Sequence, residues 1–121
     1  MDGFYLVDKD VDWTSFDVCA RMRKLLNTKK VGHTGTLDPF ATGLLLIATG
    51  KCTRLIPFFE KEQKTYVTKI ELGKDSPTLD TESELQDVPV KKEPTLKEIE
   101  QKMCSNFQGI IQQVPPQFSA I

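Results

Sequence analysis

Residues 31–43 read VGHTGTLDPFATG, a stretch that combines three glycines, three threonines, the only histidine of the chain and one carboxylate. Gly32 and Gly35 allow the backbone to take a positive φ or to approach a ligand closely. Pro39 restricts the residue before it to extended conformations. We therefore expect Asp38 to be a carboxylate that is held outward in a loop.

The same residues also occur in ordinary loops. Asp followed by Pro is a common turn or helix start, and Gly-Thr pairs are common in connections. Residue types alone therefore leave a purely structural role for the stretch open.

Length and composition are those of an ordinary globular chain. The 121 residues, of which 39% are hydrophobic and 27% charged, suffice for one modest core, and we expect a single domain. No segment approaches the roughly 20 apolar residues of a membrane helix. The N-terminus lacks a basic and then apolar signal pattern. We expect a cytoplasmic protein that has no membrane partner.

Three cysteines, Cys19, Cys52 and Cys104, stand far apart in the sequence. A zinc site needs about four ligands at close spacing, and a disulfide framework needs paired cysteines. The sequence supports neither, and we expect no metal. Cys19 lies on the apolar face of a predicted helix, where a small core residue is the simplest interpretation.

Charge is distributed unevenly along the chain. Residues 21–74 hold eleven Lys or Arg against four acids, whereas residues 1–20 and 75–121 are acidic. A partner with a phosphate backbone would require such a basic middle, although the same charges are compatible with a solvated surface.

The segments beside the central stretch carry clear signals. Residues 3–9 (GFYLVDK) predict a buried strand, and residues 44–48 (LLLIA) predict an apolar strand beneath the loop. Thr14, with an acid three residues later, predicts a helix start, and the helix runs to about residue 27. Its apolar stripe holds Val18, Cys19, Met22, Leu25 and Leu26, whereas Arg21, Arg23 and Lys24 face solvent.

Signals in the rest of the chain are weaker. Residues 53–59 predict a short helix or turn that breaks near a proline. Residues 65–73 (TYVTKIELG) alternate in polarity, which predicts a strand with one solvated face. Residues 75–93 predict a long polar loop that can carry a short strand.

The last segment predicts a helix followed by an edge strand. Thr95 and Glu98 have the spacing of a capping box, and Gly109 is placed to end the helix. Its predicted apolar stripe holds Leu96, Ile99, Met103 and Phe107. Residues 110–121 (IIQQVPPQFSAI) predict an edge strand that carries prolines.

Taken together, ordered motifs resemble those of the TruB family of pseudouridine synthases across the whole chain. The string KKVGHTGTLDPFATGLL resembles the family's catalytic loop, and GIIQQVPPQFSAI resembles its Q-x-P-P-x-x-S-A signature. The other matches are Asp8, Lys9, Thr14 and Ser15 in the opening motif; Gly50, Lys51, Thr53 and Arg54 after the apolar strand; Lys64, Tyr66, Leu72 and Gly73 in the K-x-Y strand; and, loosely, Thr78, Asp80 and Thr81.

The resemblance implies an α+β (mixed α/β) fold with an antiparallel-rich mixed sheet flanked by helices. It implies that residues 1–121 form one partial catalytic domain, without its C-terminal half and without the small RNA-binding PUA domain. The chain would then be a fragment or an inactive remnant. The complete protein is expected to be a monomer.

The implied activity is conversion of a T-loop uridine of tRNA to pseudouridine, at position 55 in the usual tRNA numbering, without a cofactor. Asp38 would be the catalytic carboxylate, acting as a nucleophile or by stabilising a glycal-type intermediate. The uridine must flip out of its stack to reach Asp38, and Tyr66 would stack on it. RNA contacts would come from His33, Gly35, Thr36, Lys9, Lys30 and Lys64.

Other interpretations were tested against the same residues. A phosphate-binding loop at Gly50 and Lys51 lacks a glycine where Leu45 stands and a Ser or Thr where Cys52 stands. An aspartyl phosphohydrolase needs a second aspartate where Phe40 stands, to help hold magnesium. An RNA-binding remnant without isomerase activity remains open. In addition, this chain has Asp10 and Asp12 where the family usually has Pro and Gly, which alters the turn and adds negative charge.

Overall fold

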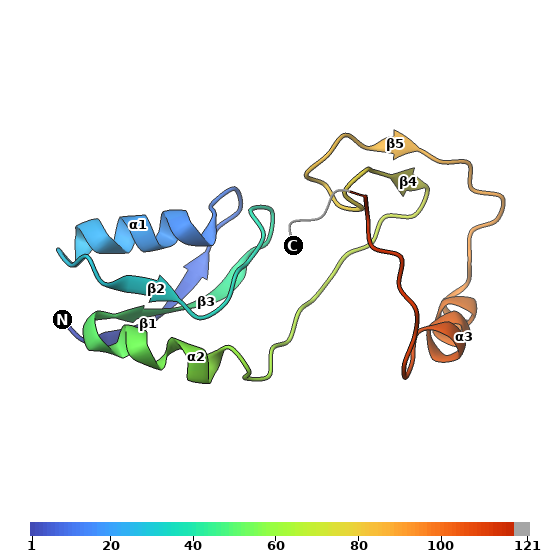
Figure 1. Cartoon of the computed structure of the whole chain (residues 1–121). Helices are drawn as coiled ribbons and strands as arrows, with labels where there is room; N and C mark the ends of the chain where they lie inside the picture. The colour runs from blue at the N-terminus through green and yellow to red at the C-terminus, as the bar shows by residue number, and fades with distance from the viewer. Residues whose placement is uncertain (118–121) are drawn as a thin grey trace. The chain divides into compact units, whose positions relative to one another are not determined.

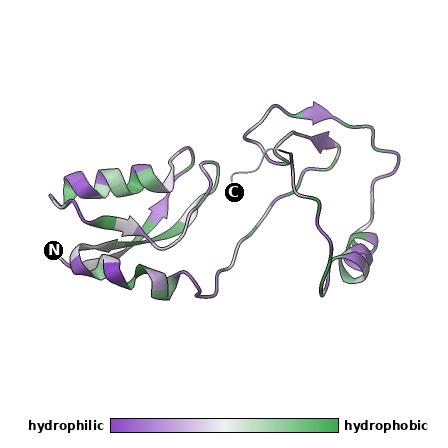
Figure 2. Cartoon of the chain, in the orientation of Figure 1, coloured by the Kyte–Doolittle hydropathy of each residue, from purple (hydrophilic) through white to green (hydrophobic). Residues whose placement is uncertain are grey.

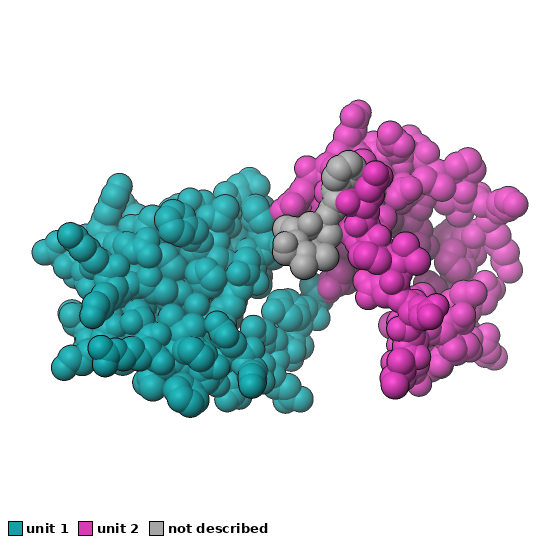
Figure 3. Space-filling view, in the orientation of Figure 1, with its two compact units in different colours: residues 1–67 teal, residues 68–121 magenta. Residues whose placement is uncertain are grey.

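The computed structural model describes residues 1–117 and divides the chain into two compact units, Met1–Val67 and Thr68–Ile121 (Figures 1 and 3). Helices and antiparallel sheets occur together, which confirms the α+β class predicted from the sequence. The expectation that all residues form one partial domain remains a prediction, because each unit is defined only by its own compactness.

A three-stranded antiparallel sheet organises the first unit, and both outer strands pair with β3, in the order β1-β3-β2. Figure 1 shows α1 on one side of this sheet and α2 on the other. The elements are β1 (Gly3–Lys9), α1 (Ser15–Leu25), β2 (Val31–His33), β3 (Gly43–Thr49), the 3-10 helix η1 (Gly50–Leu55) and α2 (Ile56–Phe59). The strand predicted over residues 44–48 is confirmed, and the first residues of the presumed loop form β2.

The core lies between α1 and the sheet. It comprises Val18, Cys19, Val31, Leu45 and Ile47, with Tyr5 and Val7 packed against it. Figure 2 shows the corresponding run of apolar colour along β3. Because successive side chains of a strand point to opposite faces, β1 turns only alternate residues toward this core.

The second face of β1 is only partly covered, so the prediction of a buried strand is wrong for that face. Phe4 packs against Phe59 of the short α2, with ring centroids 5.1 Å apart. Leu6, two residues on, is 74% exposed. Apolar sequence alone does not show whether a second layer covers a strand.

Helix α1 begins as the sequence predicts. The Thr14 side chain accepts a hydrogen bond from the Asp17 backbone N–H, and the Asp17 carboxylate accepts one from the Thr14 N–H. Cys19 is 2% exposed, and burial raises the pKa of its thiol. The predicted stripe is wrong at its end, because Leu25 is 63% exposed.

Arg23 was also expected to face solvent, and the structure corrects this. Its guanidinium donates to the carbonyl oxygens of Lys29 (3.2 Å) and Val31 (3.0 Å) and lies 5.5 Å from the Phe16 ring centroid. Arg23 thus connects the end of α1 to the start of β2, where carbonyl groups would otherwise lack partners.

The second unit holds a short hairpin of β4 (Lys74–Asp75) and β5 (Gln86–Asp87), and the helix α3 (Leu96–Asn106). The short strand predicted within residues 75–93 and the Thr95 cap of α3 are confirmed. The helix predicted after Thr95 is confirmed, and none of its residues is buried. Lys74 forms an ion pair with Asp87 across the hairpin.

Two predicted strands are missing from the described residues. Residues 65–73 are irregular, and residues 110–117 are irregular as well; residues 118–121 of the predicted edge strand lie outside the described part. A strand persists only where its backbone N–H and C=O groups find a neighbouring strand. Residues 65–73 have one backbone hydrogen bond of this kind, from the Val88 N–H to Gly73 O (2.9 Å), and no described strand is paired with either stretch. Alternating polarity by itself does not supply that neighbour.

The capping box predicts a specific pH dependence. Hydrogen bonds from the Thr14 backbone and then from its side chain lower the pKa of Asp17 from its ordinary value of 3.8. The ionised carboxylate therefore stabilises the folded state above about pH 4, and this contribution is lost as the pH falls through the lowered pKa. We expect Asp17→Asn to be less stable than the wild type at neutral pH and the difference to vanish in acid, measured by urea unfolding. A gap that stays constant from pH 7 to pH 2 would contradict this.

Candidate active site

The candidate site is the connection between β2 and β3, residues 34–42. The Thr34 N–H donates to Leu46 O (3.0 Å) and so extends the strand pairing by one residue. Asp38 to Ala41 form a turn, in which the Ala41 N–H donates to Asp38 O (2.9 Å). Asp38 is exposed, as the sequence predicts for a carboxylate held before a proline.

A second connection, between β1 and α1, holds this loop in place. The Lys9 side chain is 1% exposed, and its ammonium donates to Asp10 O (2.9 Å), Trp13 O (2.6 Å) and Pro39 O (3.3 Å). The Asp12 N–H also donates to Pro39 O (2.8 Å). The residue after Asp38 is therefore bound to both ends of the β1–α1 connection.

The residue before Asp38 is held by the same connection. Ser15, the first residue of α1, is 4% exposed. Its Oγ accepts a hydrogen bond from the Leu37 N–H (2.9 Å) and donates to Leu37 O (3.3 Å). Sequence reasoning assigned no role to Ser15, and its place in the opening motif was the only signal that could have found it.

Lys9 was predicted to contact RNA phosphate, and its burial corrects that assignment. A buried ammonium is tolerated only where its N–H groups find acceptors, and all three acceptors of Lys9 are backbone carbonyls of the site. Lys9 thus lies inside the site, between the β1–α1 connection and the β2–β3 loop. Its ammonium group is not accessible to a phosphate.

Asp12 lies in the β1–α1 connection with a positive φ. Its φ is 66°, in the left-handed region that glycine adopts freely and that aspartate tolerates better than most residues. The altered turn stays a prediction, and the Asp12 side chain adds an exposed carboxylate beside the loop.

Two of the predicted RNA-binding residues come together at the glycine turn. A Cβ placed on Gly35 would lie 2.7 Å from the Lys64 Nζ, so the ammonium lies directly against this glycine. Lys64, Lys30 and Thr36 are exposed. Both ion pairs found among residues 1–117 lie within the second unit. Among these residues, neither Lys30 nor Lys64 therefore forms an ion pair with a carboxylate.

His33 is the last residue of β2, directly opposite Ile47 on β3. The residue is half-buried, and its Nδ1 is buried without a hydrogen-bond partner among the described residues. An unsatisfied buried polar atom is unfavourable. The ring thus keeps one nitrogen away from solvent at the end of β2, next to the candidate loop.

Among the described residues, no hydrogen bond links Tyr66 to Asp38. It is 63% exposed and lies in the irregular segment that follows α2, not in the strand that the sequence predicts. The structure thus groups the loop, Ser15, Lys9 and Lys64, and leaves Tyr66 on the surface.

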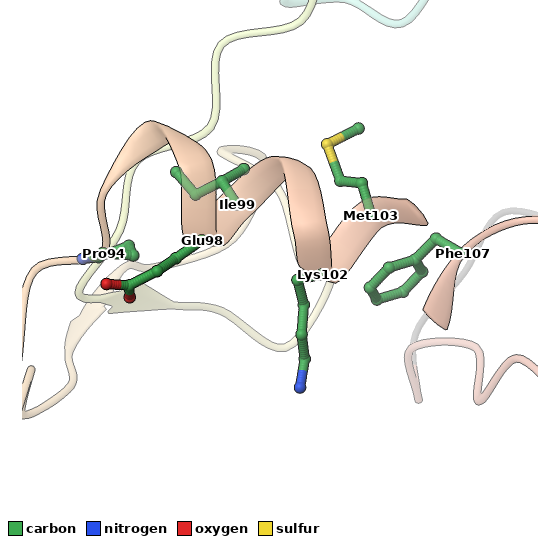
Figure 4. A pocket seen from close by; sticks show the side chains of 6 residues that line it. All are labelled: Pro94, Glu98, Ile99, Lys102, Met103 and Phe107. Carbon is green, nitrogen blue, oxygen red and sulfur yellow. The ribbon is translucent and has the colours of Figure 1, made fainter. Parts of the chain in front are cut away.

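The described residues hold neither a metal centre nor a membrane-spanning helix. Among residues 1–117, no three His, Cys, Asp or Glu side chains are placed to hold a metal ion. No helix of this part is long and apolar enough to cross a membrane. A hollow of about 380 Å³ lies in the second unit and contains no predicted site residue (Figure 4). Its lining is Pro94, Glu98, Ile99, Lys102, Met103 and Phe107.

The geometry of this loop accompanies a family match over most of the chain. Residues 23–121 match the family described as TruB family pseudouridylate synthase (N terminal domain). The protein therefore belongs to the TruB family of pseudouridylate synthases.

Named relatives agree with this placement. The chain is 44% identical over 122 residues to tRNA pseudouridine synthase B of Lactococcus lactis subsp. lactis, covering 100% of this chain and 37% of the relative. It is 46% identical over 121 residues to the enzyme of that name from Gloeothece citriformis, covering 100% and 39%. The chain spans about two fifths of the length of these relatives.

One solved structure is also similar. It is described as an H/ACA RNP bound to a substrate RNA containing 2′-deoxyuridine. The matched chain is 43% identical, the TM-score is 0.45, and the match covers 46% of this chain and 18% of that chain.

The buried ammonium of Lys9 predicts a large difference between two lysines. Lys9→Met leaves the carbonyl oxygens of Asp10 and Trp13 without the ammonium donor and removes one of the two donors to Pro39 O. We expect the free energy of unfolding to fall by about 1–3 kcal/mol. The matched control Lys30→Met changes an exposed lysine and should stay within about 0.5 kcal/mol of the wild type. Urea unfolding of both variants measures the difference. Equal stability of the two would contradict the internal role of Lys9.

Proposed function

We propose that this chain forms the Asp38-bearing part of a tRNA pseudouridine synthase that converts the T-loop uridine at position 55. The observation that carries the proposal is the exposed Asp38, in a loop whose two neighbouring residues are hydrogen-bonded to the β1–α1 connection. An exposed carboxylate on a fixed backbone suits a reaction that needs accurate placement of one charged group. The family match and the names of the relatives support the same activity.

The reaction exchanges one bond of the ribose for another. The bond from C1′ to N1 of uracil breaks, the base turns and a new bond joins C1′ to C5. C5 releases its proton and N1 takes one up, so the product is an isomer of the substrate. No electrons are gained or lost overall, so the proposed chemistry calls for no redox cofactor. Asp38 would act as a nucleophile or would stabilise a glycal-type intermediate; both routes place its carboxylate beside the ribose and the base.

The RNA would lie over the glycine turn of the loop. Lys64 and Lys30 offer exposed ammonium groups that have no carboxylate partner among the described residues. His33, the half-buried last residue of β2, would add a further contact beside the loop. Gly35 and Thr36 would allow the backbone to approach the RNA closely. We do not include Lys9 among these contacts.

Tyr66 would stack on the flipped uracil. Stacking of a base on an aromatic side chain contributes about 1–3 kcal/mol, which offsets the cost of flipping. The exposed ring of Tyr66 leaves its face open to such a contact. A tRNA substrate would place the protein in the cytoplasm.

Asp38→Asn tests the catalytic assignment. The substitution keeps the size of the side chain and removes its charge, so we expect RNA affinity and stability to stay nearly unchanged while conversion of uridine is abolished. The host is a chimera in which residues 1–121 replace the matching segment of the Lactococcus lactis enzyme, assayed on a T-arm RNA. Glu60→Gln, at another exposed carboxylate, is the control and should keep full activity.

Two outcomes would count against the proposal. Turnover by Asp38→Asn within tenfold of the unchanged chimera would remove Asp38 from the mechanism. A chimera that binds RNA and does not convert it, when the intact Lactococcus enzyme does, would favour the RNA-binding remnant.

Salt dependence tests the RNA contacts. Each phosphate contact releases counterions, so affinity of the chain for a T-arm stem-loop should fall steeply between low and physiological salt. We expect Lys30→Ala and Lys64→Ala each to reduce the slope of log affinity against log salt by about 1. Lys97→Ala, on the exposed surface of α3, is the matched control. A flat dependence, or equal slopes for all three variants, would show that these lysines are only solvated.

A further inference from the structure

The Asp38 side chain has no hydrogen-bond partner of its own among residues 1–117, although its carbonyl oxygen accepts from Ala41. Among the described residues, its position is therefore constrained through the backbone to which the side chain is attached. That backbone has two fixed neighbours, Leu37 and Pro39. Lys9 and Asp12 hold Pro39, and a single side chain, Ser15, holds Leu37.

The Ser15 hydroxyl makes two hydrogen bonds to one residue. Its Oγ accepts from the Leu37 N–H and donates its proton to Leu37 O, at 2.9 Å and 3.3 Å. A hydroxyl has one proton to donate, and Ser15 uses it here, 22 residues away in sequence. Capping of α1 does not need this hydroxyl, because Thr14 supplies the cap.

Ser15 is also well placed to transmit rigidity. It begins α1, whose Val18 and Cys19 are buried in the core against β2 and β3. The Ser15 side chain is itself 4% exposed, so its rotamer is fixed by packing. Through Ser15, the backbone of Leu37 is hydrogen-bonded to a helix that packs on the core. Leu37 is the residue directly before Asp38.

We propose that Ser15 is a positioning residue for Asp38, which holds the backbone of Leu37 so that the carboxylate meets the uridine in a productive geometry. The inference rests on the proposed function, because it assumes that Asp38 carries out the chemistry. Ser15 touches neither the substrate nor the reacting atoms in this account. Its contribution should therefore appear in the rate of the chemical step and not in RNA affinity.

The first measurement uses the chain itself. In Ser15→Ala the Leu37 N–H loses its acceptor, and we expect its amide to exchange with solvent about tenfold faster, followed by NMR hydrogen exchange. The amides of β3 should keep wild-type exchange rates. An unchanged Leu37 rate in the folded variant would overturn the proposed hydrogen bond.

The second measurement uses the active chimera. Misplacement of a reacting group by about 1 Å can lower a rate by about a hundredfold. We therefore expect Ser15→Ala to reduce the single-turnover rate by about tenfold to a hundredfold, with RNA affinity within about twofold of the parent. Ser15→Cys keeps a side chain of similar size but forms much weaker hydrogen bonds, and its rate should fall as well. A parental rate in either variant would overturn the proposal.

Val18→Ala separates positioning from general stability. Val18 is in the same helix, is 6% exposed and has no hydrogen bond to the loop through its side chain. Truncating it weakens the core while leaving the bonds to Leu37 intact. At a temperature where both variants are folded, Val18→Ala should keep the parental single-turnover rate. A loss equal to that of Ser15→Ala would assign the effect to stability and overturn the positioning role.

Asp38→Asn keeps the two proposals distinguishable. If Asp38→Asn abolishes conversion and Ser15→Ala does not slow it, only the positioning role fails. If Asp38→Asn retains conversion, the proposed function itself fails.

Discussion

A buried ammonium group, that of Lys9, is the constraint on which the site depends. Taking a charge out of water is costly unless hydrogen bonds replace the water, and Lys9 satisfies its three N–H groups with carbonyl oxygens from both loops. The β1–α1 connection and the β2–β3 loop must therefore lie in contact at Lys9. The buried Lys9 ammonium needs Pro39 O as one of its acceptors. This hydrogen bond holds Pro39 in place, together with the turn that carries Asp38.

The two connections can meet because β3, the central strand, pairs with both β1 and β2. Lys9, the last residue of β1, is opposite Gly43, where β3 begins. The loop from β2 enters β3 at the same point, and Gly43 takes a φ of 120°, which side-chain-bearing residues rarely adopt. The two connections thus meet at one end of the β1–β3 pair, and the core lies between α1 and this sheet.

The two units differ in how much of their structure rests on packing. In the first unit, the sheet and α1 share a buried core. In the second unit, α3 has no buried residue, and the β4–β5 hairpin holds only two residues per strand. Helix α3 nevertheless begins at its Thr95 cap, because capping is a local interaction that needs no tertiary partner.

The sequence by itself determined the features that depend on neighbouring residues. The starts of α1 and α3 follow from Thr14 and Thr95, the apolar run gave β3, and the exposed Asp38 follows from Pro39. The order of motifs gave the family. In each case the physical cause is local, either a cap, a restricted dihedral angle or a run of apolar side chains.

Only the tertiary structure decided the features that need a distant partner. Lys9 in the sequence is indistinguishable from a solvated lysine, and three carbonyls contributed by two separate loops make it internal. The Ser15 hydroxyl likewise finds its hydrogen-bond partner in Leu37, 22 residues away in the sequence. Residues 65–73 have the alternation of a strand and remain irregular, since backbone pairing requires a second segment at hydrogen-bonding distance. Periodicity in the sequence identifies the apolar face of a segment. Only the fold determines which segment packs against that face or pairs with that backbone.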